Sequence, residues 1–199
     1  MDSRTTKRLP QFVLLLALLL AWGWNLRALA ATDPKDEAAE DTAGFKEFMT
    51  HVKDYMHVHK SAESSLPALR PTDRPELILE HQQKLAQNIR KARPHARRGD
   101  LFTHHAREAF RHAIYTEFHG PPAPHAKATL KQGDPLPEVH LRVNQEYPKT
   151  APFTTVPPTL LLKFPKLPDE LTYRIVGHDL VLYDVKANLA VDALRGVIP

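Results

Sequence analysis

Histidine and acidic side chains near the middle of the chain have a spacing that could bind a divalent metal. His105, Glu108 and His112 are spaced i, i+3 and i+7, so a helix would place them on one face. Neutral imidazoles and a carboxylate are suitable ligands for a transition metal. The two histidines would lie two turns apart, about 10 Å, so a single ion would need another ligand from elsewhere. A solvated helix face is the alternative interpretation.

A cluster of basic side chains precedes this segment. Five cations within nine residues would create a strong local field for lipid phosphates, acidic polysaccharide or nucleic acid. No aromatic residues alternate with them, which disfavours nucleic acid as the partner. They also lie where a helix should end, and cations there offset the helix dipole without binding any ligand. The five residues are Arg90, Lys91, Arg93, Arg97 and Arg98.

Carboxylates could perform hydrolysis if they met in three dimensions. Asp179, Asp184 and Asp192 bracket a segment with the alternation of a β-sheet, although ordinary turn chemistry also explains them. No serine-hydrolase, P-loop, zinc-protease or dinucleotide-binding motif is present. The absence of cysteine excludes disulfides, thiolate metal sites and thiol nucleophiles. A catalytic role is therefore not favoured, and no cofactor is expected.

The first thirty residues predict an export signal. Arg4, Lys7 and Arg8 precede an apolar run from Phe12 to Trp24, and Ala28-Leu29-Ala30 then offers small residues at the two positions that a signal peptidase reads. As a helix the apolar run would span about 20 Å, less than the roughly 30 Å of a bilayer core, so we expect cleavage after Ala30 and no transmembrane span afterwards. The mature chain would be nearly neutral. We expect it in the periplasm or outside the cell.

Apolar periodicity predicts an N-terminal helical unit over residues 43–119. Residues 31–42 are acidic and lack large apolar side chains, so we expect a solvated, disordered leader. Helices are expected from about Ala43 to Ser64, from Asp73 as a capping residue to Ala92, and from Thr103 to Phe118. The first has a stripe of Phe, Met, Val and Tyr side chains ending at His59.

The rest of the chain predicts mostly extended structure. Residues 120–168 are rich in proline and should be mostly extended or turn, with a short strand over 139–144. Pro157-Pro158 favours a single helical turn after it, and a buried extended run is the alternative. Residues 169–199 predict a hairpin turning at Gly177-His178, with either a third strand or a short helix over residues 189–193. The fold class is thus α+β, with about three amphipathic helices and a small C-terminal antiparallel sheet. We expect both parts to share one core within a single domain, residues 43–199.

The C-terminal pattern resembles a family of exported bacterial proteins. It consists of Pro157-Pro158-Thr159-Leu160-Leu161, then Leu167-Pro168, then Tyr173-Arg174-Ile175-Val176-Gly177-His178-Asp179-Leu180-Val181-Leu182-Tyr183-Asp184, then Ala187-Asn188-Leu189-Ala190-Val191-Asp192. The similarity extends upstream over most of the mature chain and implies export without implying an activity. We therefore expect a non-catalytic envelope protein that acts through protein contacts or an anionic surface. A metal-binding protein is the main alternative, and a hydrolase the third.

Overall fold

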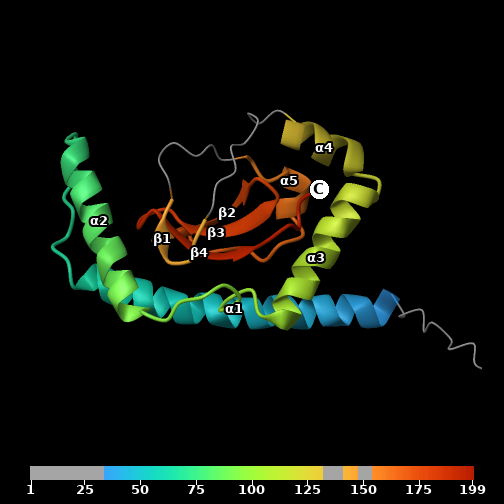
Figure 1. Cartoon of the computed structure of the whole chain (residues 1–199), viewed down its shortest axis with the longest axis horizontal. Helices are drawn as coiled ribbons and strands as arrows, with labels where there is room; N and C mark the ends of the chain where they lie inside the picture. The colour runs from blue at the N-terminus through green and yellow to red at the C-terminus, as the bar shows by residue number, and fades with distance from the viewer. Residues whose placement is uncertain (1–33, 132–140, 148–153) are drawn as a thin grey trace, which may run out of the picture. The chain divides into compact units, whose positions relative to one another are not determined.

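The computed structural model describes residues 34–131, 141–147 and 154–199 and shows an α+β fold (Figure 1). The predicted fold class is therefore confirmed, with helices first and strands last along the chain. The helices are α1 (Pro34–Ser64), α2 (Pro75–Ala92), α3 (His104–His119), α4 (Ala123–Lys131) and the single turn α5 (Pro158–Leu161). The strands are β1 (Gln145–Glu146), β2 (Leu171–Val176), β3 (Asp179–Asp184) and β4 (Leu189–Leu194).

The predicted export signal, residues 1–30, lies outside the described residues. Within the described part of the chain, no helix combines the length and apolar character that crossing a bilayer requires. Helix α1 begins at Pro34, so the prediction of a disordered leader is wrong for residues 34–42. Alanine favours the helix there, and acidic residues are stabilising near a helix N-terminus. Asp41 also contacts α3 through His112.

The starts of α2 and α3 differ in how they are capped. The prediction that Asp73 caps α2 is wrong, because Arg74 occupies the N-cap position and makes no capping side-chain bond. Pro75 has a φ angle suited to the first helical position, and this makes the preceding residue the cap. Thr103 caps α3 as predicted, and its hydroxyl accepts a hydrogen bond from the amide of Ala106.

The proline-rich stretch contains more helix than predicted. Residues 123–131 form α4, because the one proline there, Pro124, lies within the first turn, where a missing amide costs no helical hydrogen bond. The predicted helical turn after Pro158 is confirmed. The strand predicted over 139–144 is wrong for residues 141–144, since Asn144 takes a positive φ of 63° and turns the chain, and β1 follows it.

Four antiparallel strands form one sheet in the order β1-β4-β3-β2. The predicted Gly177-His178 turn joins β2 to β3, with Gly177 at a φ of 59°. Residues 189–194 form the third strand of the meander and not the alternative helix. The pairing of β3 with β4 shifts register after Leu182, and this irregularity brings Asp192 opposite Leu182.

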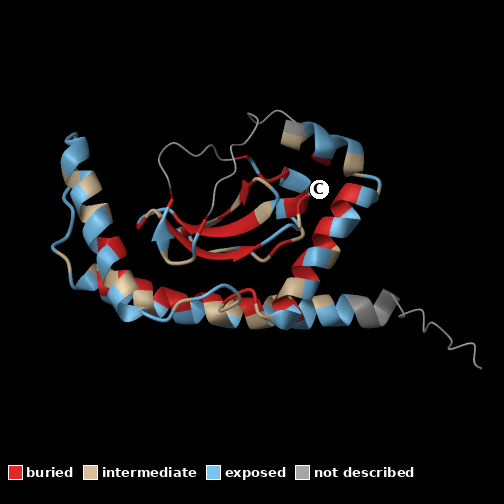
Figure 2. Cartoon of the chain, in the orientation of Figure 1, coloured by how far each residue is buried: buried red, intermediate tan, exposed pale blue. Residues whose placement is uncertain are grey.

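One apolar core joins the helices to the sheet, as predicted. The α1 stripe and the inward-facing residues of the hairpin belong to the same buried cluster, which also includes the buried faces of α2 and α3 (Figure 2). Phe48 of α1 has its ring centroid 6.3 Å from that of Tyr173 in β2 and 5.1 Å from that of Phe102. The shared residues from the two predicted sets are Phe48, Val52, Tyr55, Met56, Tyr173, Ile175, Leu180 and Leu182.

The opposite face of the sheet has a smaller core of its own. Leu141 lies before the turn at Asn144, and Tyr147 directly follows β1. Both pack there with Val181 and Tyr183. The ring centroids of Tyr147 and Tyr183 lie 5.8 Å apart in an edge-to-face arrangement. Part of the proline-rich stretch therefore covers the second face of the sheet.

Candidate functional site

The histidine face of α3 contacts carboxylates of α1. His105 Nδ1 lies 3.1 Å from Glu47 Oε2, and His112 Nδ1 lies 2.5 Å from Asp41 Oδ2. A hydrogen bond with the Thr103 side chain lowers the pKa of the Glu47 carboxyl, and the hydrogen bond and charge of His105 lower it further. Glu108 instead faces Arg111, at 3.9 Å. Each predicted metal ligand thus has a partner of its own.

No common metal centre is visible on this face. Among the residues that the structure describes, no three histidine, aspartate or glutamate side chains are grouped so that they could hold one ion. His105, Glu108 and His112 line one open groove with residues of α1, but the structure does not group them around a single ion. The partners of the two histidines lie on α1, 58 and 71 residues earlier in the chain, and sequence spacing on α3 alone gave no signal for them.

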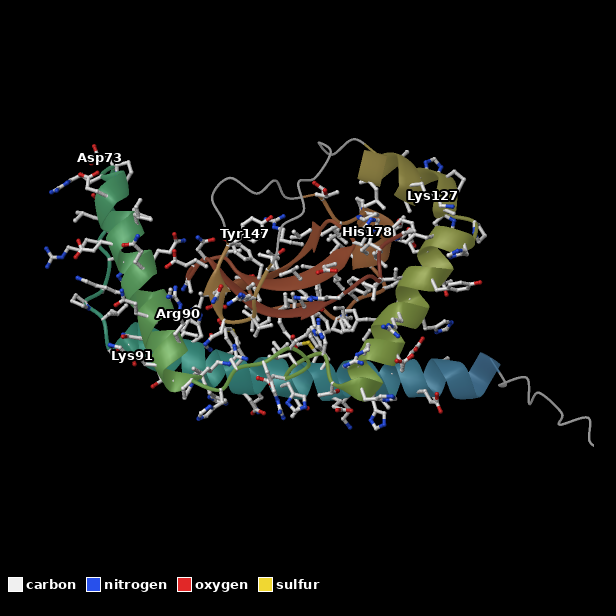
Figure 3. All side chains as sticks on the ribbon, viewed as in Figure 1. Asp73, Arg90, Lys91, Lys127, Tyr147 and His178 are labelled. Atoms are coloured by element: carbon white, nitrogen blue, oxygen red, sulfur yellow. The ribbon has the colours of Figure 1, made fainter. Side chains whose placement is uncertain are left out.

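The basic cluster separates into paired and solvated cations. At the end of α2 that meets α1, Arg90 donates to Glu146 of β1 at 2.8 Å (Figure 3). Arg93 and Arg97 both face Asp100, at 3.7 and 3.6 Å. Arg93 also lies over the Tyr55 ring, 5.1 Å from its centroid.

The two remaining cations of that cluster, Lys91 and Arg98, are exposed and have no acidic partner among the described residues. Two solvated charges on separate segments make a much weaker anion site than the five that the sequence suggested. Arg90 and Arg93 instead connect elements of the fold, whereas Arg97 pairs within its own loop.

Asp184 is the centre of a buried polar cluster between β3 and α1. Its Oδ2 accepts a hydrogen bond from the Tyr55 hydroxyl at 2.6 Å and lies 2.6 Å from His59 Nδ1. Its Oδ1 accepts from the amide of Ala187 in the β3–β4 turn at 2.8 Å. The carboxylate and both α1 side chains are buried. Burial and the neighbouring Asp184 charge raise the pKa of Tyr55 well above its usual value.

Asp192 is a second buried carboxylate, and it binds main-chain amides. It accepts hydrogen bonds from Gly99, Leu101, Phe102 and Ala193, at distances of 2.7 to 3.2 Å. Burial raises the pKa of Asp192, and the four amide donors oppose that shift. This carboxylate holds the loop between α2 and α3 against β4.

Glu117 of α3 is a third buried carboxylate. It accepts a hydrogen bond from the Thr159 hydroxyl of α5, and Lys163 Nζ lies 2.9 Å from its other oxygen. Each of the three buried carboxylates thus joins two elements of the fold and has a separate set of partners. No pair of them shares a site, so the geometry gives the hydrolase hypothesis no acid and base acting on one substrate.

An open groove lies between the C-terminal end of α1, the following loop and α2. Its volume is about 800 Å³, and Leu69 and Ile78 line it with 42% and 47% of their surfaces exposed. Figure 2 shows that α2 is buried only in the half nearer α1, and residues 75–84 include no buried side chain. We call this the α2 groove. Its lining residues are Lys60, Glu63, Ser64, Leu66, Ala68, Leu69, Ile78, His81, Gln82, Leu85, Val185 and Lys186.

Sequence inspection had a signal for the buried cluster but none for the groove. His59 ends the apolar stripe of α1, so it was a polar residue at a position expected to be buried, whereas Asp184 follows an alternating strand and was assigned to turn chemistry. The groove depends on how α2 packs on α1, and no local pattern determines that packing. Comparison with protein-family models, curated proteins and solved structures found no match for this chain.

Proposed function

We propose that the protein is exported to the periplasm or beyond, has no catalytic activity, and holds an apolar segment of another envelope protein in the α2 groove. The α2 groove is the observation that supports this function. Leu69, Ile78 and Val185 are three of the six large apolar side chains that the described residues expose, and all three line it. Exposed apolar side chains gathered in one place are typical of an interaction site.

A peptide segment fits the groove better than an acyl chain does. Ser64, His81 and Gln82 lie among the apolar lining residues, and their side chains can bond the main chain of a bound peptide. Ser64 and Gln82 donate to main-chain oxygens of the protein itself, and each keeps an oxygen that can accept from a peptide amide, a donor that an acyl chain does not offer. Lys60 is exposed at the rim and has no acidic partner among the described residues, which favours an acidic residue beside the apolar anchors.

The predicted signal segment supports export, because a positive start, a short apolar run and small residues before Ala31 are what a signal peptidase recognises. The resemblance to exported bacterial proteins is consistent with this location. The partner that fits the groove is an envelope protein with an accessible apolar and acidic segment.

Site-specific photo-crosslinking in cells tests the function. A photoreactive amino acid replaces Ile78 in the groove or Leu162, which is 87% exposed on the segment after α5. We expect a discrete adduct from position 78 only. Leu69→Asp, on the opposite wall, should abolish that adduct while circular dichroism stays unchanged, and Leu161→Asp outside the groove should leave it intact. An equal yield from positions 78 and 162, or an adduct that persists in Leu69→Asp, would reject the groove as the binding site.

A further inference from the structure

His59 lies between two carboxylates in the interior. Its side chain is fully buried, with Nδ1 2.6 Å from Asp184 Oδ2 and Nε2 3.6 Å from Glu63 Oε2. Nε2 is also without a hydrogen-bond partner at bonding distance. The His59 ring therefore links α1, which carries both His59 and Glu63, to Asp184 at the end of β3.

The neighbours of each ring nitrogen determine where protons must be. An ionised carboxylate only accepts hydrogen bonds, and so the close contact with Asp184 requires a proton on Nδ1. An unprotonated Nε2 would direct its lone pair at Glu63, placing two acceptors opposite each other in the interior. A proton on Nε2 converts that contact into a charge-assisted interaction. The geometry therefore favours the doubly protonated imidazolium.

We propose that His59 is a protonation switch that fastens the β3–β4 turn to the C-terminal end of α1. As an imidazolium it attracts Asp184 and Glu63 together. Asp184 in turn holds the amide of Ala187 in the turn. When Nε2 loses its proton, the charge-assisted bond from Nδ1 to Asp184 becomes an ordinary hydrogen bond, which weakens the attachment of the turn to α1. The contact with Glu63, one turn further along α1, loses its attraction at the same time.

Charged groups from every neighbouring element act on this ring. Lys186 of the turn lies 3.1 Å from Glu63 and 3.9 Å from Glu170, which precedes β2. Arg93, after α2, lies over the ring of Tyr55, whose hydroxyl donates to Asp184. Burial lowers the pKa of His59, but the hydrogen bond and charge of Asp184 and the charges of Glu63 and Glu170 raise it, and the balance is a raised pKa.

The direction of the pH effect follows from that balance. A histidine whose pKa is higher in the folded protein than the ordinary 6.5 stabilises the fold fully below that value. The stabilisation is lost as the pH rises through the folded-state pKa. The turn should therefore be fastened fully below pH 6.5 and should loosen as the pH rises through the folded-state pKa of His59.

Nuclear magnetic resonance of the full mature chain tests the switch. Ring nitrogen shifts of His59 and of exposed His57, two residues earlier on α1, are titrated in the same sample. We expect His59 to keep both protons at a pH where His57 has lost one. We also expect the Ala187 amide to lose protection from hydrogen exchange, corrected for intrinsic rate, with the same midpoint. A His59 midpoint at or below that of His57 would overturn the proposal, and so would constant protection of Ala187 through the His59 transition.

Glu63→Gln provides a second measurement that does not depend on changing the buried ring. Glu63 is partly exposed, and so this variant should fold. We expect the His59 midpoint to fall, because one of its attracting charges is removed, while the His57 midpoint stays in place. Lys53→Gln, an exposed change on the same helix, is the matched control. An unchanged His59 midpoint in Glu63→Gln would show that Nε2 does not sense Glu63 and would overturn the bridging role.

Discussion

Gly44 of α1 lies against the main chain of α3 at His105. A Cβ atom added at Gly44 would lie 2.6 Å from the carbonyl oxygen of His105 and 2.9 Å from the Cβ of Ala109. Real Cβ atoms do not approach main-chain oxygens so closely. The two helices can therefore cross at this distance only because residue 44 has no side chain.

Gly44→Ala should destabilise the fold by about 1–3 kcal/mol, because the added methyl group must push the helices apart. The sign of the change in the free energy of unfolding is informative, because alanine in place of glycine in an unobstructed helix interior would instead stabilise the protein by roughly 0.5–1 kcal/mol. Urea unfolding followed by circular dichroism measures the difference. Ser61→Ala, an exposed change on the same helix, is the control and should have little effect. A more stable Gly44→Ala protein would show that a methyl group fits between α1 and α3 at this crossing.

Asp192→Asn should cost about 1–3 kcal/mol, although the change preserves size. Both carboxylate oxygens accept from main-chain amides, and asparagine offers one oxygen and a donor group in place of the other. Some amide donors would therefore remain buried without an acceptor.

The matched control for this change is Asp179→Asn, whose more exposed carboxylate accepts from Gly196. We expect its unfolding midpoint to stay near that of the unchanged protein. Equal losses of stability in Asp192→Asn and Asp179→Asn would show that the main-chain hydrogen bonds to Asp192 contribute no more than the single bond to Asp179. Amide shifts of residues 99–102 should move only in Asp192→Asn.

Removal of residues 169–199 should abolish cooperative unfolding. The deleted strands supply a large share of the one core shared by helices and sheet, including Tyr173, Ile175 and Leu182. Burial of each large apolar side chain is worth roughly 1.5–3 kcal/mol, against a total stability of about 5–15 kcal/mol for a typical domain. Calorimetry of residues 31–168 is the measurement. A cooperative transition at the full-length temperature would mean that the helices form an independent unit.

Export should remove both tryptophans, Trp22 and Trp24, because each lies in the predicted signal segment. The mature protein should therefore begin at Ala31 and show only tyrosine fluorescence. N-terminal sequencing and an emission spectrum of protein recovered from the periplasm or medium are the measurements. Indole emission from that material would contradict cleavage.

Local periodicity was enough to predict the α1 stripe, the Thr103 cap and the hairpin at Gly177. These features depend on residues within about two turns of helix or two strands of one another. Helix α4 was missed because proline was weighed as a helix breaker, although in the first turn it is tolerated. The Asp73 cap was wrong for a related reason, since Pro75 set the register of α2.

The candidate site was predicted less well than the fold, because its contacts are distant in the sequence. Asp184 contacts residues 129 and 125 positions earlier. His112 and Asp41 are 71 positions apart. A single sequence shows which residues share a helix face with a histidine. It does not show which carboxylate of another helix or strand will contact that histidine. The chemistry predicted on α3 and after α2 was therefore largely used within the fold itself.

The shared core also determines when the chain can fold. The Phe48 and Tyr55 side chains of α1 are covered by strands that are synthesised more than a hundred residues later. In a nascent chain emerging from the ribosome, α2 and α3 could cover only part of the first helix until β2 to β4 had been completed. Contacts this distant slow folding, since a long loop must close before they stabilise anything. The fold is thus completed only after nearly the whole chain has been made.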